Sequence, residues 1–443
     1  MKFRIWKCDF YINFRRWKCD FFQKIAVGKV IFCIFAALKW RIMEDDIVKP
    51  ITDAFYMKLS ATNLKFKRYL YDKINWETRL IGIKGARGVG KTTILLQRIK
   101  EYFPKKGEVL YVSLDNLWFK THTLEELVAY EYAHGVTHLF LDEVHKYPDW
   151  SISIKNLYDT YNDLYIVYTG SSMLEIDYSK VDLSRRQTLY TLHGLSLREY
   201  MEFEGVMTTE PIALDDLLKR HIDIAFDLFQ KTKVLKHFSN YLESGYYPFY
   251  KDAKKDYLLQ LAEVANLVID TDLPAVEEVT YSTVKKTKVL LMLIAQNLPL
   301  MPNINKLTVQ LDTSRDLCLK MLYALDRAEL IQLLTENVKD YKHIITPEKI
   351  YLNNTNLMRA LAIKSEIGTV RETFFANQTS AVATLTMPKK GDFLINGTSL
   401  FEVGGQGKKF DQIKDIPNSY LAIDDTEVGF GNRIPLWMFG FLY

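Results

Sequence analysis

Short apolar runs separated by helical stretches dominate the chain between residues 80 and 192. These runs are rich in Leu, Ile, Val and Tyr and have the length of buried strands. They lie at residues 80–83, 109–114, 137–141, 164–169 and 188–192. Strands that alternate with helices form a parallel sheet, which binds its ligand at the carboxyl ends of the strands. We therefore predict an α/β fold for this part of the chain.

Helical patterns replace this alternation in the next part of the sequence. Residues 215–280 have the pattern of a helical, lid-like region. Three further helices and then two short strands are expected after it, and this order resembles a winged helix-turn-helix. The helices are expected at residues 288–296, 303–311 and 315–330, and the strands at 330–334 and 342–345.

The last segment combines a helix with a strand hairpin. We expect a helix at residues 370–378 and strands at 391–395 and 399–403. Asn396-Gly397 between the two strands is a strong signal for a two-residue hairpin turn, because both residue types accept positive φ. The aromatic tail at residues 429–443 is expected to close the sheet of this domain.

The first 42 residues differ from the rest of the chain in charge. They hold ten Lys/Arg and two acidic residues, whereas the whole chain has a formal net charge of +4. The remaining 401 residues are therefore net acidic. Whole-chain charge gives no argument for nucleic acid, and any such contact would have to come from a local patch.

This N-terminal segment also carries an apolar run. Residues 30–38 form its unbroken part, and nine residues are too few to span a bilayer, which takes about 18 or more. A basic start with an apolar run also fits a signal peptide, but no small-residue cleavage site follows. We prefer the hypothesis that Met43 is the real start and that residues 1–42 are a mistranslated leader.

The cysteines indicate the redox compartment. The chain has four, and none belongs to a C-x-x-C pair; they are Cys8, Cys19, Cys33 and Cys318. This spacing argues against a disulfide framework and against a zinc site, and it is typical of a reducing compartment. We therefore expect a cytoplasmic location.

The strongest chemical signal is the stretch Gly85–Thr92, which has the pattern G-x-x-x-x-G-K-[ST]. Its glycines let backbone N–H groups turn inward around a phosphate, where side chains would obstruct them. Lys91 is expected to reach the β- and γ-phosphates, and the Thr92 hydroxyl to hold Mg²⁺. A strand before the loop and a helix after it fit this role, because the helix N-terminus favours anions.

Two acidic residues follow the third apolar run. Asp142 at the end of that strand is expected to complete the Mg²⁺ site, and Glu143 to orient and polarise the attacking water. The pattern is weak alone, since many strands end in Asp. It gains force because it lies about 50 residues after a phosphate loop, a spacing read from the sequence.

Two further groups extend this candidate site. Thr169 ends the fourth strand before Gly170-Ser171-Ser172, and a polar residue there can touch the γ-phosphate or the water. The alternative is an ordinary Ser/Gly turn. Arg186, before the fifth strand, is a candidate arginine finger for this subunit or a neighbour's. The alternative is a solvated surface arginine.

The expected catalytic residues are therefore Glu143, Lys91 and Arg186. Those expected to bind the nucleotide are Gly85, Gly88, Val89, Gly90, Lys91, Thr92, Thr93 and Thr169. The expected metal ligands are Thr92 and Asp142.

The order of these motifs resembles a prokaryotic AAA+-type P-loop ATPase of the family that carries a C-terminal domain of unknown function. More particular marks of that family are Leu-Ser-Leu-Arg-Glu-Tyr at residues 195–200 and the segment 241–248. The resemblance runs from about residue 50 to Tyr443. It implies ATP and Mg²⁺ as cofactors and ATP hydrolysis as the activity, but it says little about the cellular task.

The C-terminal segment resembles the PD-(D/E)xK nuclease core. Glu372 on the helix, Asp392 at the first strand and Glu402 on the second would be its carboxylates, which gather Mg²⁺ in such enzymes. The lysine expected two residues after the last carboxylate is replaced by Gly404. Lys408 could replace it only if the loop folds back. We therefore interpret this domain as nuclease-like and inactive.

The sequence of the winged-helix-like region does not decide between a DNA partner and a protein partner. Arg315, Lys320 and Arg327 on its third helix could meet DNA phosphates, but Asp316 and Asp326 lie on the same helix. DNA contact and protein contact are both compatible with this composition.

The chain is thus expected to divide into five parts. They are the atypical leader at 1–42, an AAA+-like ATPase domain at 43–210, a helical lid at 211–284, a winged-helix-like domain at 285–362 and a PD-(D/E)xK-like domain at 363–443. The leading hypothesis is an ATPase that acts as a nucleotide-driven switch on a protein or DNA partner, with a homo-oligomer possible. The alternatives are an ATP-gated, Mg²⁺-dependent nuclease and a binding module that holds ATP as a structural ligand.

Overall fold

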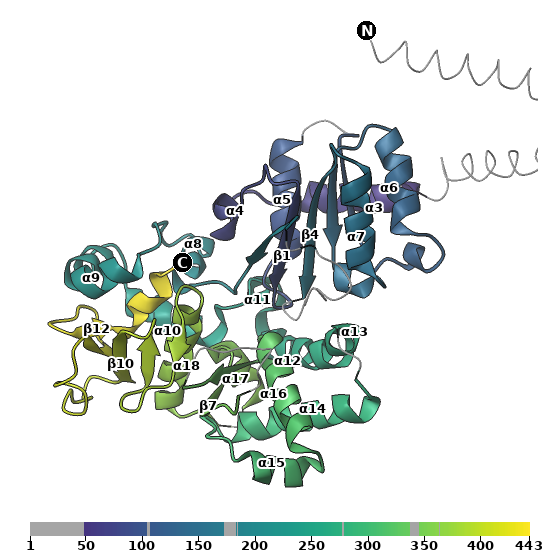
Figure 1. Cartoon of the computed structure of the whole chain (residues 1–443). Helices are drawn as coiled ribbons and strands as arrows, with labels where there is room; N and C mark the ends of the chain where they lie inside the picture. Colours follow the sequence, from purple (N-terminus) through teal and green to yellow (C-terminus); the bar gives the residue numbers. More distant parts are fainter. Residues whose placement is uncertain are drawn as a thin grey trace, which may run out of the picture. The chain divides into compact units, whose positions relative to one another are not determined.

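The computed structural model describes residues 48–103, 107–171, 183, 185–276, 279–336, 345–362 and 364–443 (Figure 1). The chain forms two compact units, Met1–Ala61 and Thr62–Tyr443. Helix α3 (Lys49–Ala61) belongs to the first unit, and every element named below belongs to the second. The proposed leader, with Cys8, Cys19 and Cys33, lies outside the described residues. Within the described ranges, no helix has the length and apolar character needed to cross a membrane.

A five-stranded parallel sheet forms the first domain of the large unit, as predicted. Its strand order is β2-β3-β4-β1-β5, and every neighbouring pair is parallel. The strands are β1 (Leu80–Gly85), β2 (Val109–Ser113), β3 (His138–Asp142), β4 (Tyr165–Ser171) and β5 (Thr188–Thr191). Strands β1, β2, β3 and β4 are almost wholly buried. Their burial explains their nearly continuous apolar sequences.

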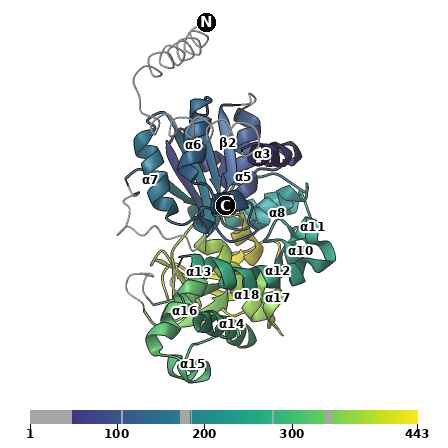
Figure 2. The same cartoon turned by 90° about the vertical axis from the view of Figure 1, so that its right-hand side faces the viewer.

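Helices cover both faces of this sheet. Figures 1 and 2 show α5 on one side of the strands and α7 on the other. The helical elements here are α4 (Leu70–Lys73), α5 (Lys91–Tyr102), η2 (Leu117–Lys120), α6 (Leu124–Ala133), η3 (Val144–Lys146) and α7 (Trp150–Thr160). Helix α6 begins at a capping box, in which Thr123 and Glu126 exchange side-chain and backbone hydrogen bonds, and these bonds satisfy backbone N–H groups at the start of the helix.

The next segment is helical, as its pattern predicted. Its elements are α8 (Leu197–Phe203), α9 (Leu214–Phe229), α10 (Val234–Ser244), α11 (Tyr250–Ala253), η4 (Lys254–Asp256), α12 (Tyr257–Leu267), the π-helix η5 (Val268–Asp272) and α13 (Leu273–Val276). The turn η5 is π-helical, and such turns are rare and often occur at functional sites.

Three helices and a two-stranded antiparallel sheet follow. They are α14 (Tyr281–Gln296), α15 (Ile304–Leu311), α16 (Arg315–Arg327), β6 (Ile331–Leu334) and β7 (Lys349–Leu352), and α17 (Thr355–Leu361) comes next. The partner of β6 is thus β7, later than the expected strand at 342–345, of which residues 342–344 lie outside the described part. Both faces of β7 are buried, so its sequence lacks the alternation that marks a strand.

Helix α16 exposes little surface for a DNA groove. Of its residues only Arg315, Asp316 and Lys320 are exposed, while eight others are buried. A recognition helix needs several accessible side chains along one face to contact base edges. The burial of α16 therefore weighs against base-specific readout by this helix.

The last domain is a mixed sheet under one long helix. Its elements are α18 (Ile367–Ser380), β8 (Leu385–Thr386), β9 (Phe393–Ile395), β10 (Ser399–Gly404), β11 (Ser419–Ile423), β12 (Arg433–Pro435) and η6 (Leu436–Phe441). The order is β12-β11-β10-β9-β8; β8, β9 and β10 run antiparallel, and β11 and β12 are parallel to β10. Asn396 and Gly397 both have positive φ, 50° and 70°, as the predicted hairpin turn requires.

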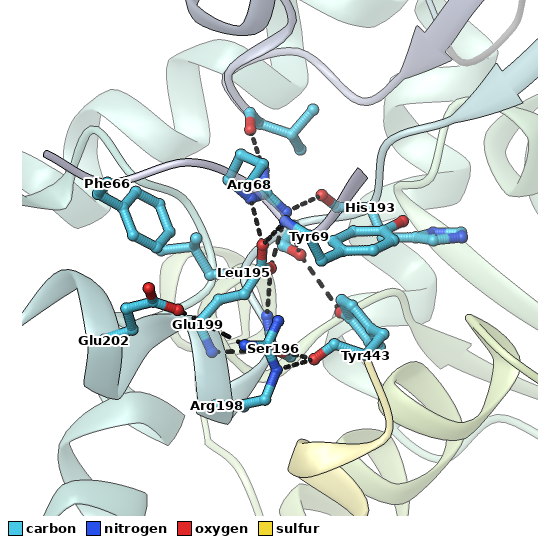
Figure 3. A network of polar contacts seen from close by, with 12 residues as sticks. Phe66, Arg68, Tyr69, His193, Leu195, Ser196, Arg198, Glu199, Glu202 and Tyr443 are labelled. Atoms are coloured by element: carbon cyan, nitrogen blue, oxygen red, sulfur yellow. Dashed lines mark hydrogen bonds and ion pairs between the residues drawn. The ribbon is translucent and has the colours of Figure 1, made fainter. Parts of the chain in front are cut away.

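A buried polar network joins the phosphate loop to the last residues of the chain (Figure 3). The Arg68 guanidinium donates to both carboxylate oxygens of Glu199, at 3.0 and 3.1 Å, and to the carbonyl of Val89 inside the loop. Glu199 belongs to a capping box with Ser196. The Ser196 hydroxyl donates to the main-chain oxygen of Tyr443 at 2.7 Å, and Arg198 donates to the same atom at 2.9 Å.

We predict that Glu199→Ala strongly destabilises the large unit. Both members of the pair are buried, with side-chain exposures of 5% and 0%, so the substitution leaves the Arg68 cation unpaired. Breaking a buried pair in this way costs about 3–5 kcal/mol of unfolding free energy. The measurement is urea denaturation followed by tryptophan fluorescence and circular dichroism.

The matched control for this prediction is Glu243→Ala. Glu243 pairs with Arg359 at 3.4 Å, but these side chains are 55% and 48% exposed, and such pairs contribute under about 1 kcal/mol. Equal destabilisation by the two substitutions would show that the buried network does not hold the unit together.

Candidate nucleotide-binding site

The loop between β1 and α5 has the backbone of a phosphate cradle. Gly88 and Gly90 have φ of 86° and 101°, in the left-handed region that a side chain would strain. Gly85 is required for space, since a Cβ there would lie 2.2 Å from the carbonyl oxygen of Leu192. The glycines of the motif are therefore explained by backbone geometry and close approach.

Lys91 folds back over this loop. Its Nζ donates to the carbonyl oxygens of Gly85 at 2.8 Å and Ala86 at 2.9 Å. Burial lowers the pKa of its ammonium, while the nearby charges of Glu143 and Asp142 act in the opposite direction. The ammonium thus lies inside the loop, within electrostatic reach of the two acids that the sequence predicted for the same site.

Asp142 collects three hydroxyl groups at the carboxyl end of the sheet. Its Oδ2 accepts hydrogen bonds from the Thr92 hydroxyl at 2.7 Å and the Tyr111 hydroxyl at 2.8 Å. Its Oδ1 accepts from the Thr169 hydroxyl. Strand β4 lies between β1 and β3, so Thr169, two residues before the end of β4, lies between the phosphate loop and Asp142.

Tyr111 is a member of this group that the sequence did not reveal. It lies on β2 opposite Phe140 of β3, and its hydroxyl reaches Asp142 at the end of that strand. Burial and the neighbouring Asp142 charge raise its pKa, so it stays a hydrogen-bond donor. The only local signal was the hydroxyl group of a tyrosine in an otherwise apolar strand. Most tyrosines in strands have that feature, so it did not single out Tyr111.

Glu143 follows the strand in a left-handed conformation, with φ of 54°. Such a conformation is uncommon for a residue with a side chain and often occurs at functional sites. Its N–H donates to the Thr169 hydroxyl at 3.2 Å, and its side chain is 23% exposed. The carboxylate is therefore accessible beside the predicted metal ligands.

The remaining loop residues have separate roles. Val89 is fully buried, and its carbonyl accepts the hydrogen bond from Arg68. Thr93 is exposed in the first turn of α5, and Ser172 lies outside the described residues. The structure thus brings Lys91, Thr92, Asp142, Glu143 and Thr169 to one edge of the sheet.

Arg186 is not brought to this edge. Thr188, two residues later, pairs with Ile81 near the start of β1, whereas the phosphate loop follows the other end of that strand. The guanidinium pairs instead with Asp159, Nε to Oδ1, at 3.0 Å. Because Arg186 precedes its strand rather than following it, it lies at the opposite edge from the phosphate loop of its own chain.

Asp272 of the π-helix η5 is a buried acid next to this site that sequence reasoning missed. Its Oδ1 lies 2.7 Å from Lys146 Nζ, 3.5 Å from Arg87 Nη1 and 3.6 Å from His145 Nε2. Burial alone would raise the pKa of Asp272, but His145 and Lys146 outweigh it and hold that pKa below its usual value. Nothing in the local sequence distinguishes this acid, because its partners come from distant segments.

The three carboxylates of the C-terminal domain lie in differing surroundings. Glu372 is engaged, since its Oε2 accepts from Lys349 and from Tyr351, both at 2.7 Å. Asp392 accepts from the N–H of Val403 at 2.8 Å. Burial raises the pKa of Asp392 and that of Glu402. The nearby charge of Glu372 raises the pKa of Asp392 further, and the charge of Asp392 raises the pKa of Glu402.

The loop after β10 does fold back onto Gly404. A Cβ on Gly404 would lie 2.8–3.0 Å from the Cβ, Cγ and Cδ atoms of Lys408. Lys408 Nζ lies 3.8 Å from Glu402 Oε2. Glu402 is 1% exposed, and its Oε2 has no hydrogen-bond partner. Lys408 thus occupies the space beside the position where the nuclease pattern has its lysine.

Neither region contains a preformed cage of protein ligands. Among the residues that the structure describes, no group of three or more His, Cys, Asp or Glu side chains is arranged to hold a metal ion. Mg²⁺ does not require such a cage, because it commonly binds one or two carboxylates and completes its shell with water and substrate phosphates.

Comparisons with known proteins found similar proteins among curated sequences and solved structures. The uncharacterized protein MJ1637 of Methanocaldococcus jannaschii is 29% identical over 296 residues, which span 62% of this chain and 62% of that protein. Among solved structures, AMPPCP-bound DnaA from Aquifex aeolicus matches with a TM-score of 0.25 and 16% identity, over 58% of this chain and 84% of that one. RuvB from Thermotoga maritima matches with a TM-score of 0.25 and 14% identity, over 72% and 95%.

A family model also matches this part of the chain. Residues 77–201 match the model described as an AAA domain. This range includes the phosphate loop, the Asp142-Glu143 pair, all five parallel strands and part of α8. The match and the observed sheet together show that residues 77–201 form an AAA domain with the P-loop ATPase fold.

Proposed function

We propose that this protein binds and hydrolyses ATP with Mg²⁺ and uses the nucleotide as a switch on a protein or DNA partner. The observation that supports this most is the convergence of five predicted residues at one sheet edge. Lys91, Thr92 and Asp142 are linked through hydrogen bonds and charge, and Thr169 joins Asp142 to the N–H of Glu143.

The residues present fit a nucleotide with its metal ion. Backbone N–H groups of the loop from Gly85 to Thr92 would hold the phosphates, since positive φ at Gly88 and Gly90 turns them inward. The oxygens of Thr92 and Asp142 are hard ligands of the kind that Mg²⁺ prefers. When bound, Mg²⁺ neutralises negative charge on the phosphate oxygens.

The remaining side chains of the site would act on the attacking water and the γ-phosphate. Lys91 would stabilise negative charge on the phosphates after it leaves the carbonyls of its own loop. Glu143 would orient the water and accept its proton, because it is the accessible carboxylate next to Asp142. Thr169 would hold the backbone of Glu143 in place through its hydroxyl.

Arg186 has a role only across an interface in this proposal. It is half-buried and paired with Asp159 at the amino end of the strands. A finger function would need a second copy of the chain whose phosphate loop faces this edge. Only the proposed role of Arg186 therefore requires an assembly of identical subunits.

The buried network of Figure 3 offers the route from nucleotide to switch. Arg68 contacts the loop at Val89 and also holds Glu199, whose capping box leads to Tyr443. A change in the loop on nucleotide binding would therefore alter these contacts with the C-terminal domain. We propose that this domain contacts the partner.

The first test is ATP hydrolysis by the full chain with Mg²⁺. We expect Glu143→Gln to lower kcat by at least about 100-fold, since it removes the general base, and to leave the dissociation constant for ATP within about twofold. Lys91→Ala is expected to lose tight binding, and EDTA to abolish turnover. Binding is measured with a fluorescent ATP analogue.

The matched control is Glu77→Gln, an exposed glutamate on the same domain, which should leave both constants unchanged. Unchanged turnover in Glu143→Gln would remove this residue from its proposed role. Running each assay with and without duplex DNA separates a DNA partner, which should stimulate hydrolysis, from a protein partner.

A second candidate function rests on the position of Lys408. We propose that Asp392, Glu402 and Lys408 form a cation-dependent phosphodiesterase site. Glu402 Oε2 is buried without a hydrogen-bond partner, and a divalent cation would satisfy it. Lys408 Nζ, 3.8 Å away, lies where it could assist an attacking water. This observation favours activity over the inactive domain expected from Gly404.

We expect metal-dependent nicking of supercoiled plasmid under this second proposal, measured on agarose gels with Mg²⁺ or Mn²⁺. Lys408→Met should lower the nicking rate at least about 100-fold, in the range of lost general acid–base assistance. Lys409→Met is the control, because the neighbouring lysine is exposed. Nicking that survives Asp392→Asn, or equal rates in both lysine variants, would refute the assignment.

A further inference from the structure

His145 lies between the candidate catalytic glutamate and the buried acid of the π-helix. Its side chain is 1% exposed. The N–H of Ser171, at the tip of β4, donates to its Nδ1 at 3.3 Å. A ring whose Nδ1 accepts a hydrogen bond carries its proton on Nε2. His145 is therefore a donor at Nε2.

This donor has two acceptors and is satisfied by neither. Nε2 lies 3.5 Å from Glu143 Oε2 and 3.6 Å from Asp272 Oδ1, and it has no hydrogen-bond partner. A buried N–H left without a partner destabilises the arrangement, because it has lost its hydrogen bond to water. One N–H serves one carboxylate well, so a displacement of less than about 1 Å would bring it into normal hydrogen-bond range of one of them.

The position of Asp272 depends on two other parts of the site. Lys146, next to His145, holds it at 2.7 Å, and Arg87 of the phosphate loop lies 3.5 Å from the same oxygen. Asp272 itself comes from the helical segment after α12, at the end of the π-helix η5. Three elements therefore meet at one carboxylate: the phosphate loop, the turn after Glu143 and the helical region.

We propose that His145 is a positioning residue that sets the orientation of Glu143 according to the place of Asp272. When Asp272 approaches, Nε2–H donates to it and the Glu143 carboxylate is free to meet the water. When Asp272 moves away, Nε2–H donates to Glu143 and holds its carboxylate. The helical region thereby regulates hydrolysis. This inference rests on the proposed ATPase function and deepens it.

Two variants at this position separate donor chemistry from packing. His145→Leu keeps an apolar side chain of similar size but removes the donor that holds Glu143, so we expect kcat to rise at least about twofold with the ATP dissociation constant within twofold. His145→Gln supplies an amide N–H that can hold Glu143 again, and kcat should return close to the wild-type value. The control His134→Leu changes an exposed histidine and should alter neither constant.

The link to the helical region is tested by a double-mutant cycle. Asp272→Asn should lower kcat, and its effect should vanish in the His145→Leu background, because the two residues act on Glu143 through the same contact. Effects that multiply would overturn the proposal, as would a His145→Leu variant whose turnover falls or whose ATP affinity changes instead of its turnover.

A readout without nucleotide completes the test. In ¹⁵N-histidine NMR spectra of the nucleotide-free chain, the resonance lost in His145→Gln should have the shifts of a neutral ring protonated at Nε2. That resonance should move in both Asp272→Asn and Glu143→Gln. A resonance that moves in neither variant refutes the contact. Absence of ATP hydrolysis by the wild-type chain would instead refute the proposed function.

Discussion

The contact between Arg68 and Glu199 is the interaction on which the rest of the structure depends. A guanidinium with 5% exposure and a carboxylate with none could not be buried separately, because an unpaired charge in the interior is expensive. Arg68 also donates to the carbonyls of Val89, His193 and Gly194. This one side chain therefore satisfies backbone groups of the phosphate loop and of the segment after β5, and it ties both to α8.

The same region shows how packing specifies small residues. Tyr246 lies against Gly194, where a Cβ would be 2.3 Å from its ring, and its carbonyl accepts the N–H of Leu195 at 2.8 Å. The ring of Phe249 lies close to Gly88. Tyr246, within the segment 241–248, and Phe249, just after it, thus pack against glycines of the phosphate loop and of the segment after β5.

The sequence predicted those features that depend on local rules. Gly88 and Gly90 were identifiable because the phosphate-loop conformation requires glycines at a fixed spacing. The pair Asp142-Glu143 was identifiable because it directly follows an apolar strand after that loop. Asp272 and Tyr111 were not, because their partners are distant in sequence and nothing local marks them. Lys408 was a special case. The nuclease pattern requires a lysine at the position of Gly404, two residues after Glu402. Only the folded loop shows that Lys408 lies beside that position.

These contacts imply that the phosphate loop is held at two points by elements outside the AAA domain. Val89 is held by Arg68 and Arg87 by Asp272, and residues 68 and 272 both lie outside the matched range 77–201. A ligand shifts a conformational equilibrium only by its differential affinity for the two states. A loop with no external partner would bind phosphate without consequence elsewhere. With both ends engaged, a rearrangement around phosphates must strengthen or weaken contacts to α8 and to the π-helix, which is the physical requirement for a nucleotide-driven switch.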